Sequence, residues 1–258
     1  MQNTLTITNK NKNNKLITLL SLSLFTLLFN SGCSLNDGDK QAADYNADLG
    51  IRYLQKGRLK LANEKLLKSL EQNPRSAKSN HYFALLQQRL KQNNKASLYF
   101  AKAVQYAPKD SEIRNNYGQF LCDNGRPNEA VNQFLVAIND PLYSTPEFAY
   151  TNAGICLRKV NNNAKAEQYF RTALKKKPSF PSALLQMAIL NKDKRNYPKA
   201  QAFMMRYEGV GRSSPEALQA CIDINSKVGL TSKAASCRTA LLRLFPSSKE
   251  AEQISSSL

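Results

Sequence analysis

The chain has no tryptophan, a single histidine, and only ten glycines and ten prolines among its 258 residues. So little glycine and proline argues against an all-β fold, because such folds need turn residues at short intervals. One histidine and the absence of a CxxC pair argue against a zinc site, and the sequence contains neither a glycine-rich phosphate loop nor a nucleophile motif. We therefore expect a helical protein that is not an enzyme and has no cofactor, metal or small-molecule substrate.

Acidic residues are also few, with 19 Asp and Glu against 37 Lys and Arg, which gives a formal net charge of +18. A charge of this size permits contact with nucleic acid, anionic lipid or an acidic partner. The basic residues are scattered along the whole chain, which is typical of a solvated surface rather than of one binding stripe. Binding to nucleic acid would require a cytoplasmic chain, and the export signal described next argues against that partner.

The N-terminus lacks an apolar run long enough to span a membrane. Residues 16–29 are apolar, but this run of 14 falls short of the roughly 20 residues that a spanning helix needs. The run follows a polar segment, residues 1–15, whose only charges are positive, and it precedes the small residues Ser31 and Gly32 and then Cys33. This order is typical of a secretory signal.

The sequence "NSGC" resembles the lipobox of bacterial lipoproteins, although Asn30 stands where that family usually has an aliphatic residue. The resemblance implies cleavage before Cys33 and lipidation of that cysteine, and Ser34 in place of Asp implies sorting to the outer membrane. An ordinary cleaved signal and an uncleaved anchor are the alternatives. We expect a signal peptide at residues 1–32, a lipidated Cys33 with a flexible tether up to position 42, and a chain anchored in the outer membrane that faces the periplasm.

The most informative pattern is an internal repeat with a period of 34 residues, lengthened once to 36. Counted from position 43, five of the units have a small residue at position 8, all six have alanine at position 20, and four have proline at position 32. The small residues are Gly50, Ala84, Gly118, Gly154 and Ala188, and the alanines are Ala62, Ala96, Ala130, Ala166, Ala200 and Ala234. This pattern resembles the tetratricopeptide repeat, which implies helix–turn–helix units stacked into a right-handed, all-α solenoid with a concave groove.

Six units account for most of the chain after the signal. Their expected boundaries are 43–76, 77–110, 111–146, 147–180, 181–214 and 215–248. The third unit is two residues longer, around "NDPLYSTPEF", which predicts a longer loop before the fourth unit. Residues 249–258 are too polar for another unit, so we expect them to form a short cap or a frayed tail.

Four cysteines lie within the repeats: Cys122, Cys156, Cys221 and Cys237. In an exported chain they are expected to form disulfides, for which three connectivities exist. The repeat register favours Cys122–Cys156, because the first helices of neighbouring units pack side by side. It also favours Cys221–Cys237, whose positions lie on the two facing helices of one unit. Buried free thiols are the alternative.

The groove of the first two units is the candidate binding site. Positions 2, 5, 9, 12 and 13 of each first helix usually face the groove in this family. In these units they include Ile51, Leu54, His81, Leu85, Gln88 and Arg89. Such a strip predicts docking of a helix or an extended peptide, unless its apolar members belong to the core. In later units the same positions hold residues that predict contact with acidic residues: Arg158, Lys159 and Lys192.

A narrower resemblance covers the middle units. The segments "NYGQFLC", "GRPNEA", "PLY", "TNAGIC" and "AEQYFRTAL" resemble the type IV pilus biogenesis/stability lipoproteins of the PilF/PilW type. This resemblance implies a pilotin, an outer-membrane lipoprotein that binds the pilus secretin subunit and promotes its localisation and multimer assembly. It also implies a disulfide between the third and fourth units, in agreement with Cys122 and Cys156. A scaffold for envelope or cell-wall assembly, unrelated to pili, is the alternative function.

Overall fold

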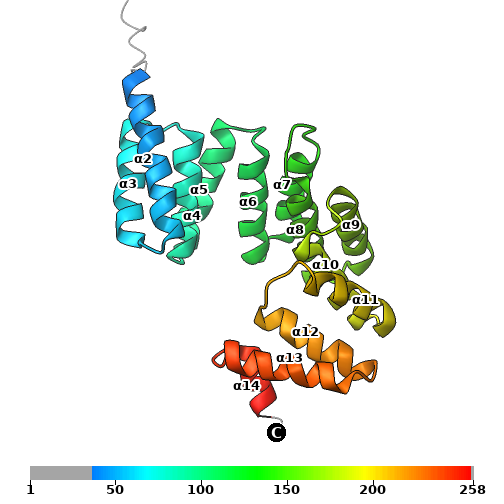
Figure 1. Ribbon diagram of the computed structural model, residues 1–258. Helices are drawn as coiled ribbons and strands as arrows, with labels where there is room; N and C mark the ends of the chain where they lie inside the picture. Colours follow the sequence, from blue (N-terminus) through cyan, green and yellow to red (C-terminus); the bar gives the residue numbers. More distant parts are fainter. Residues whose placement is uncertain (1–36, 257–258) are drawn as a thin grey trace, which may run out of the picture.

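The computed structural model describes residues 37–256, and in this part of the chain every element of regular structure is an α-helix. Cys33 and the segment before it lie outside the described residues. Figure 1 shows the helices following one another along a curved array. In chain order they are α2 (Asp37–Gln55), α3 (Leu59–Gln72), α4 (Ala77–Arg89), α5 (Asn93–Tyr106), α6 (Ser111–Asp123), α7 (Pro127–Ile138), α8 (Pro146–Lys159), α9 (Asn163–Lys176), α10 (Pro181–Asp193), α11 (Tyr197–Glu208), α12 (Pro215–Lys227), α13 (Thr231–Leu244) and α14 (Lys249–Ser255).

Consecutive helices pair into six helix–turn–helix units, from α2 with α3 to α12 with α13. Each unit also packs against the next, either between their first helices or between a second helix and the following first helix. The prediction of an all-α solenoid of six such units is confirmed. Because no single pair of helices buries its apolar side alone, the stacking of units supplies the core.

Both ends of the array differ from a plain repeat. The first helix begins at Asp37, so residues 37–42, which we expected to be part of a flexible tether, are helical. Asp37 and Asp39 in the first turn favour this early start, because negative charge stabilises a helix N-terminus. At the other end, α14 packs against α12 and α13 and buries Ala251 and Ile254, so this segment is a capping helix rather than a frayed tail.

The core of the third unit depends on the small residue at position 8. In the third unit Gly118 of α6 faces the ring of Phe134 in α7, and a Cβ atom on Gly118 would lie 2.7 Å from Phe134 Cε1. Real Cβ atoms essentially never approach another atom so closely, so this pair of helices reaches its separation only with glycine. Phe134 and the corresponding rings of neighbouring units, Phe100 and Phe170, are fully buried.

A residue in the left-handed conformation closes the turn inside every unit. Three of these residues are glycines with φ between 71° and 80°: Gly57, Gly125 and Gly229. The equivalent residues of the other units carry side chains and take φ of 58° or 59°: Lys91, Asn161 and Arg195. Only the glycines were expected from the sequence. The others show that packing of the two helices imposes the same turn where the local residue does not favour it.

The two additional residues of the third unit lengthen the loop between Ile138, the last residue of α7, and Pro146, the first of α8. Asp140 organises this loop by accepting hydrogen bonds from Ser111 Oγ at 2.6 Å and from the backbone N–H of Leu142 at 2.9 Å. Both bonds lower the pKa of the Asp140 carboxyl, and the bond from Ser111 has the larger effect. Leu142 is 89% exposed.

Replacing Gly118 with alanine should lower the free energy of unfolding by about 1–3 kcal/mol, because the new methyl group overpacks the Phe134 ring. Helix propensity alone would raise stability by about 1 kcal/mol, so the sign of the change identifies the packing effect. Gly209→Ala is the matched control, since a Cβ atom there meets only the Arg206 carbonyl at an ordinary 3.7 Å. Urea titration followed by circular dichroism should show a lower midpoint for Gly118→Ala alone; an unchanged midpoint would contradict the packing argument.

Candidate functional site

Polar side chains join the first helices of neighbouring units. Asn152 of α8 donates to Asn115 of α6 at 3.0 Å. Gln186 of α10 donates to Glu216 of α12 at 3.2 Å. These bonds fix how one unit is rotated relative to the next, and so they fix which positions of the first helices share a face.

The predicted binding residues of the first two units lie on adjacent helices. Ile51 and Leu54 lie on α2, and Leu85, Gln88 and Arg89 lie on α4, which packs beside α2. Arg89 is exposed and the other four are half-buried. Leu54 and Leu85 pack against the buried core of their units but keep part of their surface open. We call these five residues the concave strip.

The polar members of the concave strip have no side-chain partner within the described residues. The side chains of Gln88 and Arg89 make no hydrogen bond or ion pair with other residues in the range 37–256. The strip therefore combines half-open apolar side chains with one free amide and one free guanidinium. Such a combination suits a peptide that buries an apolar side and presents carbonyl or carboxylate oxygens.

His81 does not belong to this strip, and its prediction as a groove contact is corrected. The residue is only 3% exposed. Its ring centroid lies 5.4 Å from that of Tyr82 and 6.1 Å from that of Phe100. Asn116 Nδ2 lies 3.0 Å from His81 Nε2 and donates to it, which places the imidazole proton on Nδ1. The histidine therefore ties α4 to α6 and does not face a partner.

The buried position also determines the charge of this histidine. Burial lowers the pKa of His81 to about 4, because the imidazolium form is poorly solvated there, against an opposing effect of the negative charge of Asp110. The ring is therefore neutral near pH 7. A neutral ring is what the hydrogen bond from Asn116 requires, because its Nε2 atom must act as an acceptor.

In the later units the basic residues at groove positions find acidic partners within the chain. Each pair joins two neighbouring units: Lys159–Asp123 at 2.8 Å, Arg158–Asp193 at 2.8 Å and Lys192–Asp223 at 3.0 Å. We did not predict the three carboxylates as partners. A comparison of position 13 between consecutive units would have found the first pair, because Asp123 and Lys159 both occupy it. These cations are therefore already neutralised, unlike Arg89.

The structure joins all four cysteines of the repeats in two disulfides. Cys122 of α6 is bonded to Cys156 of α8, with their Cα atoms 5.7 Å apart, so this bond links the third unit to the fourth. Cys221 of α12 is bonded to Cys237 of α13, with their Cα atoms 6.2 Å apart, so this bond joins the two helices of the last unit.

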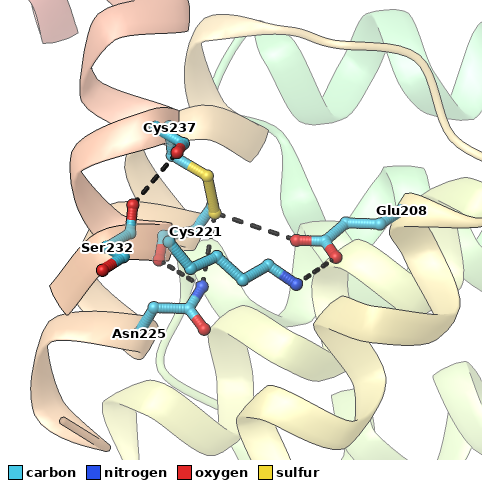
Figure 2. The surroundings of a disulfide bond; sticks show 7 residues. Glu208, Cys221, Asn225, Ser232 and Cys237 are labelled. Carbon is cyan, nitrogen blue, oxygen red and sulfur yellow. Dashed lines mark hydrogen bonds and ion pairs between the residues drawn. A yellow bond between two sulfur atoms is a disulfide. The ribbon is translucent and has the colours of Figure 1, made fainter. Parts of the chain in front are cut away.

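Figure 2 shows the second disulfide beside polar side chains of the fifth and sixth units. Asn225 Nδ2 lies 3.3 Å from Cys221 Sγ, and Glu208 Oε1 lies 3.8 Å from the same sulfur. The other carboxylate oxygen of Glu208 accepts a hydrogen bond from Lys233 Nζ at 2.6 Å. This ion pair connects α11 of the fifth unit to α13 of the sixth.

Within residues 37–256 no group of three or more His, Cys, Asp or Glu side chains could hold a metal ion. In the same range no helix has the length and apolar character needed to cross a membrane. The lipidation predicted at Cys33 falls outside this range. The candidate functional features that the described residues offer are the concave strip and the two disulfides.

Six stacked helix–turn–helix units, five of which have a small residue at position 8, define a repeat solenoid. The chain matches the family model for the tetratricopeptide repeat over residues 45–214 and belongs to that family. Within the family it is 30% identical over 216 residues to the type IV pilus assembly protein PilF of Pseudomonas aeruginosa. That alignment covers 84% of this chain and 86% of the relative, and the two proteins are homologous.

Solved structures of relatives have the same architecture. The structure of Pseudomonas aeruginosa PilF superposes with a TM-score of 0.75 at 29% identity, and the match covers 86% of this chain and 100% of that chain. PilW, whose structure is described as that of a widely conserved type IV pilus biogenesis factor, gives a TM-score of 0.74 at 29% identity over 83% of this chain and 98% of its own. The resemblance to the PilF/PilW type is confirmed.

His81 should make the protein less stable in mild acid. The unfolded chain binds a proton on this histidine below about pH 6.5, whereas the folded chain binds it only near pH 4. Stability contributed by the neutral histidine is therefore present above pH 6.5 and is lost as the pH falls towards 4, by about 3 kcal/mol in all. His81→Gln keeps an acceptor for Asn116 and does not titrate, so it should lack this loss.

Urea midpoints of the two proteins at pH 7, 5.5 and 4.5 test this expectation. Carboxylate titration is common to both proteins and cancels in the difference. The advantage of the wild-type chain over His81→Gln should shrink as the pH falls. A difference that stays constant over this range would show that His81 is not held neutral by burial.

The two disulfides should differ in how much they stabilise the fold. Cys122 and Cys156 are 34 residues apart, and Cys221 and Cys237 are 16 apart. Loop-closure entropy then predicts a loss of about 4 kcal/mol for Cys122→Ser/Cys156→Ser and about 3 kcal/mol for Cys221→Ser/Cys237→Ser. Denaturant unfolding of both double variants, with the wild-type chain in dithiothreitol as the control, checks the order. Non-reducing peptide mapping that finds four free thiols would refute both pairings.

Proposed function

We propose that the protein is an outer-membrane lipoprotein of type IV pilus biogenesis and acts there as a pilotin. It binds the pilus secretin subunit and promotes its localisation to the outer membrane and its assembly into multimers. The observation that carries the proposal is the likeness to PilF, 30% identical over 84% of this chain. The order of basic, apolar and small residues ahead of Cys33 supports export and lipidation.

The proposed anchor lies close to the first repeat in the sequence. Cys33 is four residues before Asp37, where α2 begins. Four residues extend over at most about 14 Å, so an acylated Cys33 holds the first unit near the bilayer. Two or more acyl chains are needed for stable anchoring, which a fully processed lipoprotein cysteine provides. A subunit bound to the first units is then carried to the same membrane.

The concave strip is the proposed docking surface for the secretin subunit. Its apolar residues are open in part and lie on two adjacent helices, which suits a helix or an extended segment. Its free Arg89 and Gln88 add donors for backbone or carboxylate oxygens. The groove positions of later units are less open to a partner, because Arg158, Lys159 and Lys192 are engaged in ion pairs with the chain's own carboxylates. This favours the first two units as the docking surface. The proposed role is binding, without catalysis.

Ile51→Asp and Leu85→Asp should each reduce binding of the purified secretin subunit at least tenfold, because they place a charge at the apolar part of the strip. Ile155→Asp is the matched control, since Ile155 occupies the same position 9 in the fourth unit and is also half-buried. All three variants should fold and retain lipidation. Surface plasmon resonance with detergent-solubilised full chains measures the binding.

The same variants test the function in cells. Deletion of the gene should reduce secretin multimers in the outer-membrane fraction, and the wild-type chain and Ile155→Asp should restore them. Ile51→Asp and Leu85→Asp should not. If multimers are unchanged after deletion, the pilotin role is wrong. If Ile155→Asp fails as the others do, the loss reflects a general defect of the solenoid and not the concave strip.

A further inference from the structure

A hollow of about 550 Å³ lies between the first two units and shares no residue with the concave strip. Its lining comes from α3, from α4 with the turn after it, and from the start of α5. It combines apolar and basic side chains: Leu59, Lys60, Leu67, Phe83, Leu90 and Lys95. Both lysines are exposed, and neither forms an ion pair with the other described residues. We call this feature the first-junction hollow.

At other junctions of the array, the chain's own carboxylates lie at the corresponding place. Between the second and third units, Arg126 donates to Ser97 Oγ at 3.2 Å and pairs with Glu129 at 2.7 Å. Between the fourth and fifth units, Glu167 pairs with Lys194. In both cases a salt bridge occupies the surface between a second helix and the turn of the following unit.

The junction of the fifth and sixth units gives the closest comparison. Lys233 there occupies the same repeat position as Lys95 and pairs with Glu208 at 2.6 Å. Glu208 appears beside the disulfide in Figure 2. At the first junction the residue that corresponds to Glu208 is Leu70, so Lys95 has no carboxylate to meet.

The other two carboxylates are missing from the first junction as well. By repeat position, the counterparts of Glu129 and Glu167 are Lys95 and Asn63. Between positions 49 and 109 the chain has thirteen Lys and Arg but only two acidic residues, Glu64 and Glu71. Glu64 is paired with Lys65 at 2.6 Å. Neither Lys60 nor Lys95 is paired with either of these carboxylates, so both charges at the first-junction hollow are unbalanced.

We propose that the first-junction hollow binds an acidic peptide segment that carries an aliphatic or aromatic side chain. The apolar side chain covers Leu59, Leu67 and Phe83, and flanking carboxylates pair with Lys60 and Lys95. The peptide thus supplies from outside the charge that Glu208 supplies to Lys233 from within the chain. The volume lies within the range of about 300–1,000 Å³ that is usual for binding sites.

Two features favour a peptide over other anions. A nucleic-acid phosphate would satisfy the lysines but would leave the apolar lining exposed to water. A lipid headgroup is disfavoured by position, because Leu59 and Lys60 follow the C-terminal end of α2, while the N-terminal segment leaves from the other end, about 27 Å away along the helix. The proposal does not depend on a role in pilus assembly.

Fluorescence anisotropy with the full chain in detergent tests this proposal. The probes are labelled hexapeptides with Asp or Glu at both ends and Leu or Phe at the two central places, each with an amide isostere in which Asn and Gln replace the acids. The acidic peptides should bind at least tenfold more tightly than their isosteres. The double variant Lys60→Gln/Lys95→Gln should bind the acidic peptides at least tenfold more weakly than the wild-type chain does.

Asn63→Glu adds a second, independent variant. It places a carboxylate where Glu167 lies in the fourth unit and one helical turn from Lys60, so it should abolish peptide binding without lowering the thermal midpoint. Lys175→Gln/Lys199→Gln is the matched control, because both lysines are exposed and form no ion pair with the other described residues. It should bind the peptides within twofold of the wild-type chain, as should Ile51→Asp.

Three results would overturn the proposal. One is that no acidic peptide binds more tightly than its isostere. Another is that the control loses as much affinity as Lys60→Gln/Lys95→Gln. The third is that these two substitutions abolish binding to phosphatidylglycerol vesicles or to a DNA oligonucleotide while peptide binding is unaffected, which would assign the hollow to a different anion.

Discussion

The close approach of two helices inside each unit is the constraint on which the rest of the structure depends. At Gly118 the ring of Phe134 lies too close for a Cβ atom, and Gly154 meets the ring of Phe170 in the same way. Five of the six units have Gly or Ala at this position, so their two helices can approach closely and the units share one repeat register. The register in turn decides which residues of the first helices share the concave face.

Some cations of the first helices are paired with carboxylates of a neighbouring unit, and others are not. Lys78 pairs with Asp48 between the first two units, and Lys159–Asp123 and Lys192–Asp223 are examples from the later units. In the second unit, Arg89 and Lys95 have no partner among the described residues. A paired cation joins two units, whereas an unpaired cation is open to an external anion. Each of the two proposed binding surfaces includes an unpaired cation.

The repeat period determines what could be predicted from the sequence. It identified the six units and, through their register, placed Cys122 beside Cys156 and Cys221 beside Cys237, as the structure has them. The period led to a wrong prediction for His81. Position 5 usually faces the groove in this family, but here the His81 ring is hydrogen-bonded to Asn116 of the next unit.

Contacts between units are what the period does not encode. The ion pairs of the later groove depend on which residue the neighbouring unit presents, and the left-handed turns at Lys91 and Arg195 depend on the helices that flank them. The helical start at Asp37 was missed for a different reason, since residues before the first unit have no repeat to be compared with. To predict the ion pairs and the left-handed turns, adjacent units would have to be compared position by position, in place of a comparison with the average unit.

The two disulfides act at different levels of the array. Cys221–Cys237 closes a single unit, while Cys122–Cys156 crosses the boundary between two. In a solenoid whose units touch only their neighbours, disorder enters at the ends and advances one junction at a time. The disulfide at the central boundary keeps the third and fourth units together when an end of the array opens. The first two units lie outside both disulfide loops, so apart from the backbone only noncovalent contacts hold them against the third unit.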